Sequence, residues 1–283
     1  MIQFQPVQFN TESIAAYARL FELCFSNNSK FNSTYLRWLY TENPYGKAVG
    51  FDAWDGGVLV AHYVAVPLRI KLELQEVSAL LSLNTATHPS YQGKGLFTKL
   101  ADRTYDAAGQ LGYAAVVGVA NANSTPGFTR KLGFQLVEPL AARIGVGPLP
   151  ACASRADAQL RTTWSADALA WRCRNPNNKV FVRPHDSIVQ VYARGVGKFL
   201  YAYAELSRNQ LDLAEVPAPG ESLSPFRLYL GLEPGQARSG AYVDIPQRFR
   251  PSPLNFIYRP LSTSVQNLDR GVISFSFIDF DAY

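Results

Sequence analysis

Hydrophobic residues in the middle of the first half of the chain follow two different periods. Residues 78–87 are rich in Leu and Thr and predict a strand. From Leu96 to Leu111 the apolar residues recur at helical spacing, and Gly112 is placed to close that helix. The Val-rich residues 113–120 predict a further strand. The pattern therefore predicts a strand, a turn, a helix and a second strand in direct succession.

The residues before this unit predict the rest of a mixed sheet. Two amphipathic segments come first, and the second ends before Asn43-Pro44, where a helix is disfavoured. Asp55-Gly56-Gly57 then joins two strands in a hairpin. We therefore expect an α/β domain over residues 1–145, a mixed sheet with helices on both faces. Its expected helices cover 11–24 and 35–39, and its expected further strands cover 48–54, 58–67 and 68–74.

The turn between the strand and the helix has the composition of a phosphate-binding loop. A glycine-rich turn that opens a helix presents unpaired backbone N–H groups at the positive end of the helix dipole, and small residues let a phosphate come close. The dinucleotide fingerprint and the Walker loop need other spacings, and neither is present. The turn therefore predicts a pyrophosphate site at Gln92, Gly93, Lys94, Gly95, Leu96 and Phe97.

The segments after the turn extend this pattern. A polar loop at residues 121–124 follows the second strand, and Thr125 with Pro126 can start a short helix that stops at Gly133-Phe134. This order of elements resembles the core of the GNAT acetyltransferase superfamily, whose turn is written Arg/Gln-x-x-Gly-x-Gly/Ala. The turn matches that pattern except at Phe97, where the family usually has a small residue.

The resemblance implies acetyl-CoA as cofactor and an amine as acetyl acceptor. In the family, the backbone at the end of the cofactor strand leaves its neighbouring strand, pairs with the pantetheine arm and points an N–H at the thioester oxygen. The residues implied in cofactor binding are Leu83, Thr85, Ala86, Thr87, Gln92, Gly93, Lys94, Gly95, Leu96, Phe97, Asn121, Asn123 and Ser124.

Three residues are candidates for catalysis, each with a structural alternative. Asn84 is polar in an apolar strand and must find a partner when buried, either the acceptor or pantetheine or the neighbouring strand. His62 lies on a strand expected to border the acceptor site, and an imidazole titrates near neutrality, but a lone strand histidine is often a packed side chain. Asn121, with Ser124, is implied at the pantetheine or leaving sulfur, or else it caps its loop.

The resemblance also shows what is missing. Family enzymes often carry a tyrosine in the short helix before Gly-Phe, where it protonates the departing thiolate, and here that position holds Thr129. The three cysteines show neither an activating context nor a metal-ligand spacing. We therefore expect no metal and direct attack by the amine in a ternary complex.

The second half, residues 150–283, contains an echo of the first. Residues 33–38 followed by Asn43-Pro44 resemble residues 165–171 followed by Asn175-Pro176. The echo indicates either a duplication or two unrelated helices that end before a proline. No second phosphate turn is present. We therefore expect a GNAT-like or acceptor-shaping domain, joined through a Gly/Pro-rich linker at residues 144–158.

The composition agrees with a globular enzyme. The 283 residues are 47% hydrophobic and 17% charged, no apolar run has the length of a membrane helix, and no secretory signal is visible. A net charge of +5 without basic runs argues little for nucleic acid. We expect a cytoplasmic protein with a small-molecule partner.

The acceptor is predicted to be an amino sugar linked to a nucleotide, bound between the two halves. Tyr40 falls where family members shape the acceptor pocket. Arg172 and Arg174 follow the Trp171 helix and could hold a diphosphate, since arginine forks match phosphate oxygens, or they form a solvated basic face. Two other functions stay open: acetylation of a lysine in a peptide, and non-catalytic sensing of acyl-CoA, which the absent tyrosine makes plausible.

Overall fold

The computed structural model describes residues 1–25, 29–149, 157–195, 197, 199–207, 223–234, 241–250 and 252–280. The first half contains the strands β1 (Gln3–Pro6), β2 (Val49–Asp55), β3 (Val58–Leu72), β4 (Gln75–Thr87), β5 (Ala115–Ala120), β6 (Gln135–Pro139) and β7 (Ala141–Val146), and the helices α1 (Thr11–Cys24), α2 (Ser33–Thr41), α3 (Leu96–Gln110) and α4 (Thr125–Lys131). The second half contains α5 (Ala166–Cys173) and the strands β8 (Leu160–Thr162), β9 (Val180–His185), β10 (Ile188–Arg194), β11 (Tyr201–Ser207), β12 (Phe226–Leu232), β13 (Tyr242–Asp244), β14 (Asn255–Pro260) and β15 (Ile273–Ser276).

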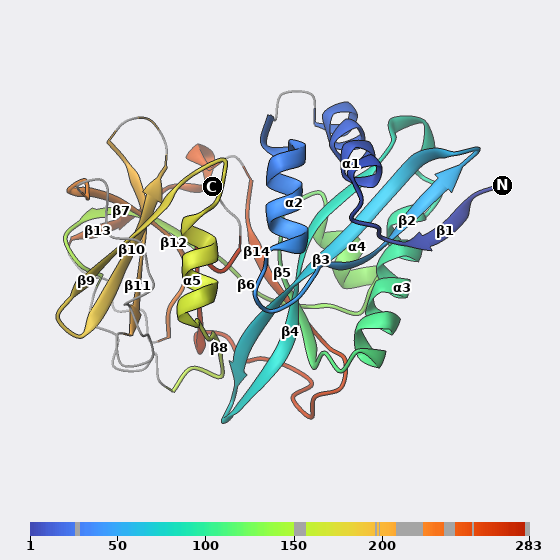
Figure 1. Ribbon diagram of the computed structural model, residues 1–283. Coiled ribbons are helices and arrows are strands. Elements are labelled where there is room, and N and C mark those ends of the chain that lie inside the picture. Colours follow the sequence, from blue (N-terminus) through green and yellow to red (C-terminus); the bar gives the residue numbers. More distant parts are fainter. Residues whose placement is uncertain are drawn as a thin grey trace.

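The strands of the described residues join in one continuous mixed sheet, which confirms the predicted fold class (Figure 1). Its main path runs β6-β14-β5-β4-β3-β8-β15-β12-β11-β10-β9, and β2 pairs with β3 beside β8. Helices α1 and α2 cover one face of the first half and bury Tyr17, Phe21 and Leu39 there. Helices α3 and α4 cover the opposite face with Leu100 and Phe128. The central strands are therefore covered on both sides.

Strand β3 corrects the expected break between residues 67 and 68. Proline lacks an N–H and normally interrupts a ladder. On one edge, β3 pairs with β2 only as far as Ala65 and with β8 only from Ile70, so neither strand lies opposite Pro67. In this gap the carbonyl of Pro67 accepts a hydrogen bond from Asn43 Nδ2 at 2.7 Å. The N–H and C=O of a strand residue point to the same edge, so the missing donor costs no ladder bond. The strand continues through the proline.

One strand of the second half lies inside the sheet of the first. Strand β14 pairs antiparallel with β5 on one edge and with β6 on the other. Its central residues Phe256, Ile257 and Tyr258 are fully buried, with Ile257 packed among the residues of α3 and α4 and its two neighbours in the core on the other face. The sheet therefore continues across the boundary expected between residues 145 and 150, and the division into two domains stays a prediction.

Helices α2 and α5 meet through a reciprocal pair of tryptophans. The indole N–H of Trp38 donates to the carbonyl of Trp171 at 3.1 Å, the indole N–H of Trp171 donates to the carbonyl of Trp38 at 3.3 Å, and the rings stack 4.8 Å apart. Trp38 follows its helix N-cap, Asn32, by the same number of residues as Trp171 follows its N-cap, Ser165. The two copies of the sequence echo therefore contact each other through two equivalent hydrogen bonds, one in each direction. Whether they arose by duplication stays a prediction.

We expect Trp171→Ala to destabilise the protein by roughly 3–5 kcal/mol, because the change removes a buried aromatic side chain and its hydrogen bond to the Trp38 carbonyl. Urea unfolding followed by circular dichroism measures this. Phe199→Ala, at a 75% exposed position, should change the free energy of unfolding by no more than about 0.5 kcal/mol. Equal effects of the two substitutions would contradict the role of the tryptophan pair.

Candidate active site

The site begins where β4 leaves β5. The two strands pair in parallel only over Ala79–Ser82 and residues 115–118, so among the described residues the edge of β4 from Leu83 onward has no strand partner on this side. On its other edge β4 carries a bulge, because Leu83 and Asn84 together face Val64 alone. A bulge bends its strand and raises the local twist, which turns the strand end away from its neighbour. The separation starts at the residues where the resemblance predicts it.

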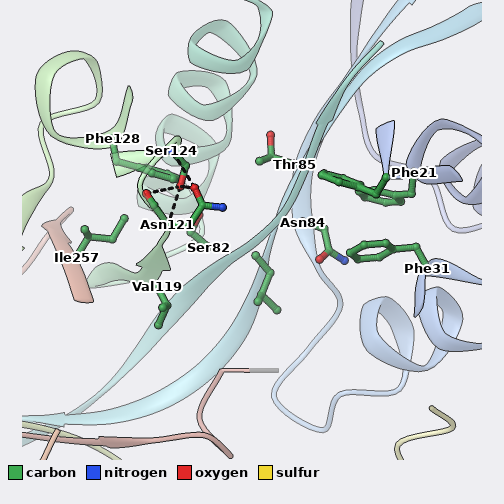
Figure 2. A pocket seen from close by; sticks show the side chains of 12 residues that line it. Phe21, Phe31, Ser82, Asn84, Thr85, Val119, Asn121, Ser124, Phe128 and Ile257 are labelled. Carbon is green, nitrogen blue, oxygen red and sulfur yellow. Dashed lines mark hydrogen bonds between the residues drawn. The ribbon is translucent and has the colours of Figure 1, made fainter. Parts of the chain in front are cut away.

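A pocket of about 180 Å³ fills the opening between the two strands (Figure 2). One wall carries Asn121, Ser124 and Phe128, which follow β5, and the opposite wall is aromatic. The lining residues are Phe21, Phe25, Phe31, Ser82, Leu83, Asn84, Thr85, Val119, Asn121, Ser124, Phe128 and Ile257. The pocket thus joins the unpaired edge of β4 to the surfaces of α1 and β14.

The turn before α3 has the geometry that phosphate binding requires. Gly93 and Gly95 adopt φ values of 75° and 69°, a region that side chains disfavour. Gly95 is the N-cap of α3, and no side chain caps the helix, so its first N–H groups remain available. The turn is exposed, and Lys94 adds a positive charge while its ammonium lies 4.2 Å from the Tyr91 ring centroid. This end of α3 can hold a pyrophosphate.

Phe97, the departure from the family pattern, is a packing residue. Its ring contacts Phe128 edge-on at 5.2 Å and Tyr63 at 5.9 Å between centroids. A Cβ at Gly127 would lie 3.1 Å from this ring, so the large side chain of Phe97 is accommodated by the absence of one on α4. Only the backbone of Phe97 therefore remains for the predicted cofactor contact.

Asn121 holds its own loop together and still faces the pocket. Its Oδ1 accepts hydrogen bonds from the backbone N–H groups of Asn123 and Ser124 and from the Ser124 hydroxyl, at 2.9 to 3.1 Å. Its Nδ2 takes no part in these bonds and points toward Thr85 and Asn84 (Figure 2). The loop-capping role of this residue is therefore observed, while its contact with the pantetheine or the leaving sulfur stays a prediction. Asn123 is exposed and does not line the pocket. The N-cap of α4 is Ser124 and not Thr125, because the helix starts one residue earlier than the sequence predicts.

A chain of buried polar side chains ends at the pocket. His62 Nδ1 lies 2.6 Å from Asp52 Oδ1, His62 Nε2 lies 3.1 Å from the Tyr40 hydroxyl, and Asn84 Nδ2 donates to that hydroxyl at 3.0 Å. The exposed fractions are 2% for Asp52, 0% for His62 and Tyr40, and 8% for Asn84. His62 and Tyr40 therefore do not touch the pocket themselves, and the structure connects them to it through Asn84.

Tyr17 completes the chain at its inner end. Its hydroxyl donates to Asp52 Oδ2 at 2.7 Å, and its ring stacks on His62 with 4.0 Å between centroids. Burial and the nearby Asp52 carboxylate raise the pKa of Tyr17 far above its ordinary value, and burial does the same to the pKa of Tyr40. A raised phenol pKa means that both hydroxyls keep their protons at neutral pH and can donate.

The remaining candidates from the sequence lie away from the pocket. Arg172 is only 5% exposed, with its guanidinium 4.6 Å from the Trp171 ring centroid, and burial lowers its pKa to about 10. Arg174 is exposed, and neither arginine lines the pocket. Ala86 is buried among residues of α1 and α2, and the Thr87 carbonyl accepts from Cys24 Sγ at 3.3 Å and from Gln92 Nε2 at 3.5 Å.

Several residues of the site have no sequence signal of their own. Phe25 and Phe31 are apolar residues like many others, and Ile257 lies far along the chain. Asp52 is a charged residue in an expected strand, which is a weak hint of a buried partner. Nothing in the sequence shows that this partner is His62.

Residues 7–137, just under half of the chain, match the family model of the acetyltransferase (GNAT) domain. The match confirms the predictions of an acyltransferase and of acetyl-CoA as its cofactor. A search of the curated proteins finds no significant match.

Solved structures resemble the chain over nearly all of its length. A GCN5-related N-acetyltransferase from Anabaena variabilis has a TM-score of 0.58 at 12% identity, and the alignment covers 92% of this chain and 73% of that protein. A probable N-acyltransferase from Enterococcus faecalis has a TM-score of 0.59 at 10% identity, and the alignment covers 93% of this chain and 73% of the other. Eis1 from Mycobacterium abscessus has a TM-score of 0.56 at 12% identity, with 92% of this chain and 74% of the other covered. At these identities the likeness shows a shared fold that includes the second half.

Two features were not found in the described part of the chain, a membrane-spanning helix and a cluster of metal ligands. None of its helices has the length and apolar character to cross a membrane. Nor does it bring three His, Cys, Asp or Glu side chains together where they could hold a metal ion.

Gly95→Asp should weaken coenzyme A binding roughly tenfold or more, because a carboxylate would lie beside the phosphate charge. Isothermal titration calorimetry with coenzyme A measures the change. Gly95→Asn, the uncharged isostere, should lose much less, and Gly56→Asp places the same side chain in a left-handed turn away from the pocket. Unchanged affinity of a folded Gly95→Asp variant would exclude this turn as the pyrophosphate site.

Proposed function

We propose that this protein is an N-acetyltransferase that moves the acetyl group of acetyl-CoA to the primary amine of a compact small molecule, by direct attack in a ternary complex. The observation that carries the proposal is the opening between β4 and β5, where an unpaired strand edge borders an aromatic pocket and leads along the chain to the glycine turn before α3. The turn would bind the pyrophosphate, and the Leu83–Thr87 edge would bind the pantetheine arm.

The chemistry needs an oriented amine and a polarised carbonyl. Acetyl-CoA supplies an electrophilic thioester. A backbone N–H of the open β4 edge would donate to the thioester oxygen and stabilise the negative charge that develops there. The amine nitrogen would form a bond to the carbonyl carbon as the carbon–sulfur bond breaks, and the proton lost by the amine would end on the thiol. Thr129 stands in the place of the family's tyrosine, so that residue is not available as the acid.

The described cysteines are poor candidates for a covalent intermediate. Neither Cys24 nor Cys173 lines the pocket. Burial raises the pKa of both thiols, that of Cys173 to about 12, so at neutral pH each carries its proton and is a weak nucleophile. Cys152 lies outside the described residues. These observations support direct transfer.

The aromatic wall supports a compact acceptor with an apolar or flat face. Phe21 and Phe31 stack with 4.4 Å between ring centroids, and Phe25 lies 5.8 Å from Phe31. No Lys, Arg, Asp or Glu is among the lining residues. The hydrophobic face of an amino sugar suits such a wall, whereas a diphosphate would need cations that this pocket lacks. The nucleotide-linked amino sugar expected from the sequence therefore stays a prediction, and we favour acceptors without phosphate.

One observation favours a second candidate, a non-catalytic sensor of acyl-CoA. The lining residues include no titratable side chain that could act as a general base or acid at the pocket. Such a protein would bind acetyl-CoA without turning it over. The two candidates differ in turnover and agree in binding.

A panel of amines tests the proposal. The purified protein with acetyl-CoA should release coenzyme A thiol, and form an acetylated product identified by mass, with compact amines such as benzylamine, tyramine or glucosamine. A nucleotide-linked amino sugar and a lysine peptide should react more slowly. Calorimetric binding of acetyl-CoA without turnover of any of these amines would support the sensor and overturn the enzyme.

Intact-mass analysis tests the direct mechanism. After incubation with acetyl-CoA alone, the protein should carry no acetyl group on Cys24, Cys152 or Cys173, because no described thiol is activated. A stoichiometric adduct that an added amine discharges would instead require an acyl-enzyme.

A further inference from the structure

The amide of Asn84 has two unlike ends, and the structure determines which end faces the pocket. Its Nδ2 donates to the Tyr40 hydroxyl at 3.0 Å. Its Oδ1 lies on the side of the pocket toward Asn121 and Ser124 (Figure 2), and no described residue donates to it. An amide oxygen accepts hydrogen bonds and an amide nitrogen donates them, so a flipped Asn84 would present the opposite chemistry.

The direction of the hydrogen bonds in the buried chain follows from Asp52. A carboxylate only accepts, so the proton between Asp52 and His62 lies on Nδ1. In a neutral imidazole Nε2 is then an acceptor, and it accepts from the Tyr40 hydroxyl. The Tyr40 proton is then used, and its oxygen accepts from Asn84 Nδ2. Tyr17 donates to the second oxygen of Asp52 and so leaves the first to His62. Every hydrogen bond in this buried series is therefore donated in the direction of Asp52.

We propose that Asp52, His62 and Tyr40 are positioning residues that hold Asn84 with its carbonyl oxygen toward the pocket, where this oxygen accepts an N–H bond from the acceptor amine. This inference rests on the proposed function. An amine must aim its lone pair at the thioester carbon, and a bond from one of its N–H groups to a fixed acceptor orients that lone pair. An amide oxygen does not take the proton, so Asn84 orients the amine and is not its base.

A purely structural role for these four residues would not explain why their series of hydrogen bonds ends at the pocket. Asp52, His62 and Tyr40 each have two polar partners or more within the protein. Asn84 is the member at the bulge of β4, beside the open edge, and it keeps an acceptor free toward the pocket. The orienting bonds thus lie in the core, while the group that they orient reaches the site.

Tyr40→Phe tests the orientation, with Tyr35→Phe as matched control. Both tyrosines are fully buried on α2, but the Tyr35 hydroxyl has no hydrogen-bond partner among the described residues. With the most active amine of the panel, Tyr40→Phe should lower kcat/KM roughly tenfold and leave the Kd for acetyl-CoA unchanged, because the amide loses the bond that orients it. Tyr35→Phe should stay within about twofold. Equal losses in both variants would overturn the inference.

Asn84→Asp separates orientation from stability. A carboxylate has two equivalent ends, so it presents an acceptor oxygen to the pocket however it is turned. Asn84→Asp loses the N–H donated to Tyr40 and should lower kcat/KM by itself, but Tyr40→Phe should lower the remaining activity no further in the Asn84→Asp background. A loss from Tyr40→Phe that is as large in this background as in the unmodified protein would overturn the inference.

The ¹⁵N chemical shifts of His62 give a readout that does not depend on acetyl transfer. In the free protein, Nδ1 should be protonated and Nε2 bare, and Tyr40→Phe should shift the Nε2 signal because it removes the donor. Protonation of Nε2 would reverse the chain and overturn the inference. If the expected shifts are found but no amine in the panel reacts, the proposed function fails together with the role of Asn84 toward an amine, and only the direction of the chain stands.

Discussion

The pairing of β4 with β5 ends where β4 begins to bulge against β3, and the site depends on this arrangement. The pairing with β5 ends at Ser82, and the bulge occupies the next two residues. Backbone groups that would have entered a ladder bond are therefore free at the place where the two strands diverge. The pocket, the approach to the phosphate turn and the position of Asn84 all follow from this separation.

The two faces of the sheet contribute different parts of the site. The face of α3 and α4 provides the glycine turn and the Asn121 loop, which suit a phosphate and a polar arm. The face of α1 and α2 provides the phenylalanine wall and the buried chain from Asp52 to Tyr40. The opening in β4 joins the faces, so a donor bound on one side can meet an acceptor bound on the other.

The second half supports this arrangement from within. Strand β14 separates β5 from β6 and places Ile257 in the pocket lining, and α5 packs its tryptophan on α2. Arg172, expected at the acceptor, stacks on this tryptophan pair. Because arginine can cover an aromatic face as readily as it can bind a phosphate, its spacing in the sequence could not distinguish the two roles.

The sequence by itself determined the local features: the mixed α/β fold of the first half, the glycine turn at the start of a helix, and the polar loop after the next strand. Each depends on residues that are close along the chain, so periodicity and turn chemistry are sufficient. The tertiary structure alone decided the long-range pairings. A regular hairpin from Asp55-Gly56-Gly57 would place Asp52 opposite Ala61, and only the bulge at Ala53 and Trp54 brings it to His62. One inserted residue changes every later pair in a ladder, and the packing that selects such an insertion involves α1 and α2, which no local pattern contains.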